Sequence, residues 1–149
     1  MREKFTEMLK TAMKAGDKRR VDTLRLIIAE QKKVDIDARG AGKTVGDEEL
    51  LAMLQKMVKS RQESLSIYEK AGREDLAAQE RGEIEIINEF LPKAMGDEEI
   101  KLAIKAVIAD LGATSMKDMG KVVAALKSKY AGQIDFSKAS GLVKAALGG

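Results

Sequence analysis

Apolar residues recur at steps of three and four along almost the whole chain, and no stretch sustains the strict alternation of a half-buried strand. A step of three or four returns to the same face of an α-helix, so each such stretch predicts an amphipathic helix. The commonest residues, among them alanine, leucine, lysine and glutamate, favour helices, and proline occurs once. The sequence therefore predicts an all-α fold.

Glycines, one loop and the single proline divide this pattern into separate helices. Four predicted helices of a helical hairpin type precede Pro92, with the loop of residues 39–46 in the middle. Proline cannot continue a helix and disfavours helical geometry in the residue before it. Three shorter predicted helices follow the proline. We therefore predict an N-terminal helical domain over residues 1–92 and a three-helix tail domain over residues 96–149.

The chain contains no histidine and no cysteine. This excludes His general bases, Cys–His and Ser–His nucleophile pairs, and a zinc site of the usual type. The Gly-Lys-Thr at residues 42–44 has Asp37 where a phosphate-binding loop requires glycine. No acid–base constellation converges in the sequence. We therefore expect no catalytic residue, no metal site and no cofactor, and we interpret the chain as a binding or accessory protein rather than an enzyme by itself.

The first ten residues are charged from Arg2 onward and lack the apolar core of a signal peptide. Apolar runs elsewhere are too short to span a bilayer. The absence of cysteine is compatible with a reducing compartment. These observations lead us to expect a cytoplasmic protein with no membrane partner.

One charged residue interrupts the apolar stripe of each of two neighbouring predicted helices. Arg61 lies in the stripe of residues 47–71, and Glu80 lies in the stripe of the next helix. Helices joined by a short turn pack as antiparallel neighbours. We therefore predict that Arg61 and Glu80 form a structural ion pair across the interface. The alternative is that both side chains extend to the rim and keep their charged ends in water.

Residues 114–130 predict a helix that begins with a capping box at Ser115. Lys117 and Lys121 are four residues apart and share a face, with Gly120 between them. A glycine beside two ammonium groups leaves a low backbone surface that a phosphate group can approach. Because the net charge of the chain is only +3, a basic patch has to come from geometry. The alternative is an ordinary solvated face.

Five segments, spread from residue 9 to residue 135, together resemble the YqeY family, and the resemblance extends over nearly the whole chain. They are LKTAMKAGDKRRVDTLRLI (residues 9–27), KSRQESLSIYEKAGREDLAAQE (59–80), INEFLP (87–92), DMGKVVAALK (118–127) and GQID (132–135). In this family an N-terminal helical domain precedes a tail similar to that of GatB. GatB is the tRNA-engaging subunit of the glutamine-dependent amidotransferase that corrects misacylated tRNA. The family pattern usually has a basic residue at the position of Gln133, so one positive charge is missing here.

The resemblance implies a tRNA-binding or accessory protein related to the GatB tail, because that tail contacts the body of the tRNA. The catalytic domains of the amidotransferase have no counterpart in this sequence. The implied partner is tRNA or another folded RNA, recognised by shape and phosphates, since few aromatic residues are present for stacking. The candidate nucleic-acid-binding residues are Lys117, Gly120, Lys121, Lys127, Lys138 and Lys144.

Two alternatives to RNA binding stay open. The first is a protein–protein interaction module. The second is an accessory to the amidotransferase, a carbon–nitrogen ligase with glutamine as amido-N-donor, a label that similarity alone would attach to this chain. An amidotransferase or another protein is then the partner.

Overall fold

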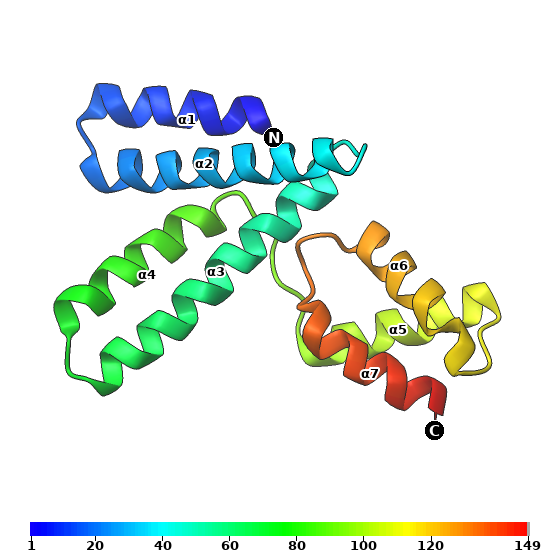
Figure 1. The fold of residues 1–149 in the computed structure, drawn as a ribbon. Coiled ribbons are helices and arrows are strands. Elements are labelled where there is room, and N and C mark those ends of the chain that lie inside the picture. The colour runs from blue at the N-terminus through cyan, green and yellow to red at the C-terminus, as the bar shows by residue number, and fades with distance from the viewer. Residues whose placement is uncertain (149) are drawn as a thin grey trace. The chain divides into compact units, whose positions relative to one another are not determined.

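The structure is a computed structural model that describes residues 1–148 (Figure 1). Within these residues every regular element is helical, which confirms the predicted all-α fold. The elements are α1 (Arg2–Ala15), α2 (Lys18–Gly40), α3 (Asp47–Lys70), α4 (Glu74–Asn88), α5 (Asp97–Leu111), the 3₁₀ helix η1 (Met116–Asp118), α6 (Met119–Lys129) and α7 (Phe136–Gly148).

The chain forms two compact units, which we call the N-terminal unit (Met1–Leu91) and the C-terminal unit (from Pro92 onward). In the N-terminal unit, α1 packs on α2 and α3 packs on α4 as two helical hairpins, and α2 also packs on α4 and α3 (Figure 1). Their shared core includes the fully buried Phe5, Leu24 and Ile87.

Local chemistry fixes where these helices begin and end. Gly16 has a φ of 69°, a left-handed conformation that favours glycine and stops α1. The next residue, Asp17, caps α2 by accepting a hydrogen bond from the backbone N–H of Arg20. At the start of α3, the Glu49 carboxylate accepts the backbone N–H of Gly46 at 2.9 Å. Acidic residues in that first turn also favour the positive end of the helix dipole.

The C-terminal unit packs α5, α6 and α7 around a second core. Ile104, Val122, Leu126 and Val143 are buried there. The turn between α6 and α7 is tied to the start of the unit, because the backbone N–H of Met95 donates to the carbonyl of residue 133 at 2.9 Å. The unit is therefore a three-helix bundle with a core of its own.

No helix within residues 1–148 is long and apolar enough to cross a membrane. In the same residues, no group of three or more aspartate and glutamate side chains is arranged to hold a metal ion.

Candidate nucleic-acid interface

The segment predicted to begin a helix at Ser115 starts differently in the structure. Residues 116–118 form the 3₁₀ turn η1, and α6 follows from Met119. The Ser115 side chain makes no capping hydrogen bond. Instead, the Asp118 carboxylate accepts the backbone N–H of Thr114 at 3.1 Å. The capping box is therefore wrong in detail, because the carboxylate reaches one residue further back across a tighter 3₁₀ turn.

Lys117 in η1 and Lys121 in α6 are both exposed, and neither forms an ion pair with another residue of the described range 1–148. Gly120 lies between them and is exposed as well. A Cβ atom added to Gly120 would meet no heavy atom within 4 Å. The junction of η1 and α6 therefore presents two ammonium groups beside an unobstructed stretch of backbone.

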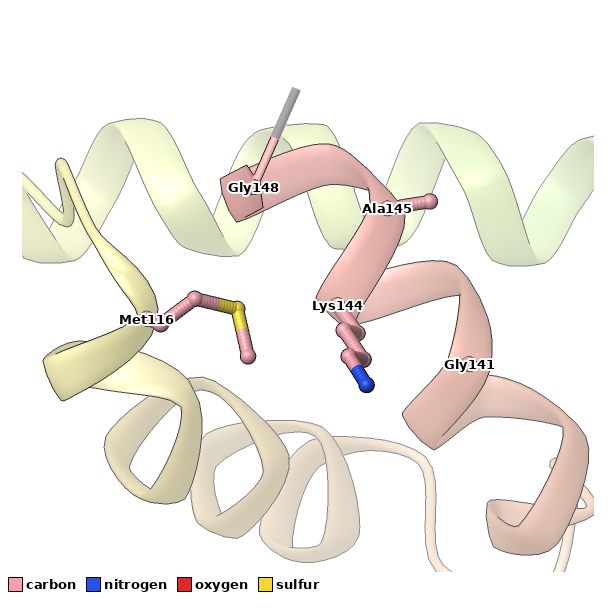
Figure 2. Close-up of a pocket in the computed structure, with 5 residues that line it drawn as sticks. All are labelled: Met116, Gly141, Lys144, Ala145 and Gly148. Carbon is pink, nitrogen blue, oxygen red and sulfur yellow. The ribbon is translucent and has the colours of Figure 1, made fainter.

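A shallow hollow lies between η1 and the second half of α7 (Figure 2). It is lined by Met116, Gly141, Lys144, Ala145 and Gly148. The Met116 side chain extends toward α7, and the Lys144 side chain extends into the space between the two segments (Figure 2). The hollow therefore brings Lys144 beside the residue that precedes Lys117. Three of the lining residues on α7, namely Gly141, Ala145 and Gly148, are small and recur at steps of four and three. The spacing in the sequence could have revealed this face, which was not predicted.

The other two predicted lysines have partners of their own. The Lys138 Nζ lies 2.6 Å from Oδ1 of Asp97, at the start of α5. This hydrogen bond lowers the pKa of the Asp97 carboxyl, with a smaller charge effect from the same lysine. The Lys127 Nζ lies 5.7 Å from the centre of the Phe136 ring, where α7 begins.

The six predicted residues therefore fall into two groups. Lys117, Gly120, Lys121 and Lys144 lie toward the end of the α6–α7 pair where η1 contacts α7. Lys127 and Lys138 lie toward the opposite end, and the charge of Lys138 is matched by a carboxylate. We call the first group the η1–α7 cation site. Lysine ammonium groups bind phosphates as point charges, so this site is suited to a phosphate backbone.

In the N-terminal unit, Arg61 pairs with Glu83 and not with Glu80 as the sequence suggested. The Arg61 Nε lies 2.9 Å from Oε2 of Glu83, and its Nη1 donates to the Met57 carbonyl at 3.1 Å. Both partners are largely buried, with 17% and 13% of their side-chain surfaces exposed. The register of the hairpin explains the correction. Arg61 stands eleven residues before Gly72 and Glu83 stands eleven residues after it, whereas Glu80 is only eight residues away.

Glu80 is left with a buried oxygen, Oε2, that has no hydrogen-bond partner. Burial raises the pKa of the Glu80 carboxyl, the charge on Glu83 raises it further, and Arg61 lowers it by less. A carboxyl whose pKa is raised by folding stabilises the protein when protonated, and this contribution is lost as the pH rises through the folded-state pKa. The ionised form of Glu80 is therefore a destabilising feature of the interface between α3 and α4 at neutral pH.

We predict that Glu80→Gln raises the free energy of unfolding by about 1 kcal/mol at neutral pH, because an ionised carboxylate with a buried unpaired oxygen is replaced by a neutral amide. The gain should shrink as the pH falls through the pKa of Glu80, since the native carboxyl then becomes neutral too. Urea unfolding at neutral and acidic pH measures both effects. Glu85→Gln, an exposed change on the same helix, is the control. An equal gain for Glu85→Gln, or a loss for Glu80→Gln, contradicts the prediction.

Comparison with known proteins identifies the family. The model of the Yqey-like protein family matches residues 2–147. The chain belongs to the YqeY family. This confirms the resemblance seen in the sequence, and the matched range includes every residue of the η1–α7 cation site.

This YqeY chain is similar to proteins of several other organisms. A protein of Vanderwaltozyma polyspora is 33% identical over 118 residues, which cover 74% of this chain and 62% of the relative. A protein of Pyrenophora tritici-repentis is 29% identical over 127 residues, which cover 81% of this chain and 68% of the relative. Both are named "Altered inheritance of mitochondria protein 41, mitochondrial". The YqeY chain therefore spans about two thirds of the length of these relatives.

The names of these relatives contradict the cytoplasmic location expected from the sequence, because all of them describe mitochondrial proteins. That expectation rested on the absence of a secretory signal and of cysteine. Neither feature distinguishes the cytosol from an organelle. The cytoplasmic expectation for this YqeY chain is therefore wrong by comparison with its relatives.

Proposed function

We propose that this protein binds the phosphate backbone of a folded RNA through its C-terminal unit, and that tRNA is the first RNA to test. One observation carries the proposal: Lys117, Lys121 and Lys144 are exposed in η1, α6 and α7, and none of them forms an ion pair within the described residues. The likeness of the family tail to GatB supports an RNA ligand. In this proposal the protein is a binding or accessory factor, and it supplies no catalytic group.

The chemistry of the site sets the mode of recognition. Lysines neutralise phosphates and release their counterions, which makes affinity depend steeply on salt. Phosphate contacts position a protein on RNA but carry no sequence information. Aromatic side chains, which stack on unpaired bases, make up only 3% of the chain. The expected ligand is therefore a structured RNA recognised by its shape and backbone, with little base preference.

Binding of the full chain to a tRNA transcript across a salt series tests the proposal. We expect Lys117→Ala/Lys121→Ala to weaken binding about tenfold at low salt, and to reduce the slope of log affinity against log salt by about two, because two phosphate contacts are lost. The loss should be the same for tRNAs of different sequence, since no base edge is read.

Lys101→Ala/Lys105→Ala is the matched control, because these exposed lysines are also four residues apart and belong to the same unit. Within the part of the chain that the structure describes, Lys105 forms no ion pair, and Lys101 forms only an exposed one with Glu98, which contributes little to stability. Equal weakening by the two double variants would show a general charge effect and refute the site. Absence of tRNA binding at low salt would refute the function and turn attention to protein partners.

We predict a separate result for Gly120→Ala, which has opposite effects on stability and binding. The variant should gain about 0.5–1 kcal/mol of stability, because alanine is the better helix former and the space around Gly120 is open. It should bind tRNA several-fold more weakly if a phosphate group approaches this backbone closely. Unfolding and tRNA titration of one sample measure both. Undiminished binding would remove Gly120 from the site while leaving its lysines in place.

A further inference from the structure

The N-terminal unit has a strongly uneven distribution of charge. Residues 1–43, which include the α1–α2 hairpin, contain twelve Lys and Arg against seven Asp and Glu, a net charge of plus five. Residues 44–91, which include the α3–α4 hairpin, contain six against eleven, a net charge of minus five. The net charge of the whole chain is therefore small even though the N-terminal unit packs a basic hairpin against an acidic one.

Four cations of the basic hairpin recur every seven residues along α2. They are Lys18, Arg25, Lys32 and Arg39. Seven residues are almost two turns of an α-helix, so the four lie along one face, each about 10.5 Å from the next. All four are exposed, and none of them forms an ion pair within the described residues. We call this row the α2 cation stripe.

Other arginines of the same hairpin have structural roles, which sets them apart from the stripe. Arg20 pairs with Glu89, the residue that follows α4, with 2.6 Å between Nη1 and Oε2. Arg19 lies across Gly82 of α4, where an added Cβ atom would stand 2.7 Å from its Nη1. These arginines join α2 to the acidic hairpin. The stripe residues make no such contact, so the packing of the N-terminal unit does not account for their charge.

We infer that the α2 cation stripe is a second docking surface for an RNA phosphate backbone. This goes beyond the proposed function, because the stripe belongs to the other unit and does not depend on the η1–α7 cation site. A row of exposed, unpaired cations complements a polyanion, and the acidic hairpin repels one, so the ligand is directed to the α1–α2 side. An anionic membrane is a poorer fit, because the apolar face of α2, with Leu24 and Ile27, is buried in the core.

Titration of the full chain with a mixed-sequence RNA duplex across a salt series tests the inference. The variant Arg25→Gln/Lys32→Gln removes two charges from the middle of the stripe, and glutamine keeps the helix propensity. We expect its affinity to fall about tenfold at low salt and its salt slope to fall by about two. The matched control, Lys56→Gln/Lys70→Gln, removes two exposed lysines from α3 of the acidic hairpin. It should retain both affinity and slope.

The outcomes separate this inference from the proposed function. If Arg25→Gln/Lys32→Gln weakens RNA binding and Lys117→Ala/Lys121→Ala does not, the result supports the stripe and refutes the C-terminal site. If only Lys117→Ala/Lys121→Ala weakens RNA binding, the result overturns the stripe. Equal effects of the α2 and α3 variants also overturn it. A further result would overturn the stripe as an RNA site: light scattering detects a salt-sensitive dimer, and the α2 variant loses this dimer while its RNA binding is unchanged. In that case the stripe pairs with the acidic hairpin of a second copy.

Discussion

Replacing Arg61 with alanine should lower the free energy of unfolding of the N-terminal unit by about 3 kcal/mol. Arg61 is the only cation paired with Glu83 among the described residues. Without it, the Glu83 carboxylate is left beside Glu80 in a largely buried interface. The two carboxylates then repel each other without compensation. The loss should be smaller at acidic pH, because burial raises the pKa of the Glu80 carboxyl and its neutral form no longer repels Glu83. Hydrogen exchange of α3 and α4 peptides, followed against denaturant, measures the effect.

The double variant Arg61→Met/Glu83→Gln is the control for this effect. It removes the ion pair while keeping most of the side-chain volume, and replacing both members of a buried pair is far less destabilising than removing one. It should recover much of the stability lost in Arg61→Ala. If Arg61→Ala costs less than about 1 kcal/mol at neutral pH, then the pair is effectively solvated and the interpretation is wrong.

Phe5→Ala should destabilise the N-terminal unit by about 3–5 kcal/mol, the largest single effect that we expect in this protein. Phe5 is fully buried, and its ring meets that of Phe90 edge to face, with 4.9 Å between the ring centres. Alanine removes this aromatic pair and leaves a cavity between α1 and the end of α4. Protection of α1 and α4 amides against hydrogen exchange should fall together.

The control for Phe5→Ala is Phe5→Leu, which keeps most of the buried apolar volume but not the aromatic pair. It should lose less than half as much stability as the alanine variant. Thr6→Ala, an exposed change at the next position of α1, should alter stability by less than about 0.5 kcal/mol. A Phe5→Ala protein as stable as Thr6→Ala would show that the contact with Phe90 does not hold α1 in place.

The positions of the helices were predictable because residues close to each helix end determine where the helix begins or stops. Gly16 and Gly112 adopt left-handed conformations, with φ of 69° and 64°, and each stops a helix where the sequence predicted. Glu49 and Glu99 each stand three residues after a glycine and accept its backbone N–H. Such signals act over a few residues, so they can be read without knowledge of the tertiary structure.

Partners that are distant in sequence were not predictable in the same way. Lys138 and Asp97 are separated by 41 residues and meet only because α7 packs on α5. The partner of Arg61 was predicted one helical turn away from its true position. Glu80 and Glu83 lie on the same face of α4, so spacing alone does not decide between them. Counting outward from Gly72, which has a φ of 69°, would have given Glu83.

The candidate site was predictable in part. The spacing of Lys117, Gly120 and Lys121 pointed to one face. Nothing in the sequence showed that Lys144 shares a hollow with Met116, or that Lys127 lies beside Phe136 at the other end of the bundle. The α2 cation stripe is a different case. Its seven-residue repeat is visible in the sequence. The total charge gave no sign of it, because the positive charge of residues 1–43 is balanced by the negative charge of residues 44–91.

The opposite charges of the two N-terminal hairpins also bear on how fast this unit folds. Its hairpins join helices that are neighbours in the chain, so each closes only a short loop and can form early. We expect the docking of α2 onto α4 to be the slower event, because it brings together segments from different hairpins. A basic hairpin and an acidic one attract each other before they touch. The charge separation therefore steers the final collapse of the N-terminal unit and favours the native pairing of its halves over a random encounter.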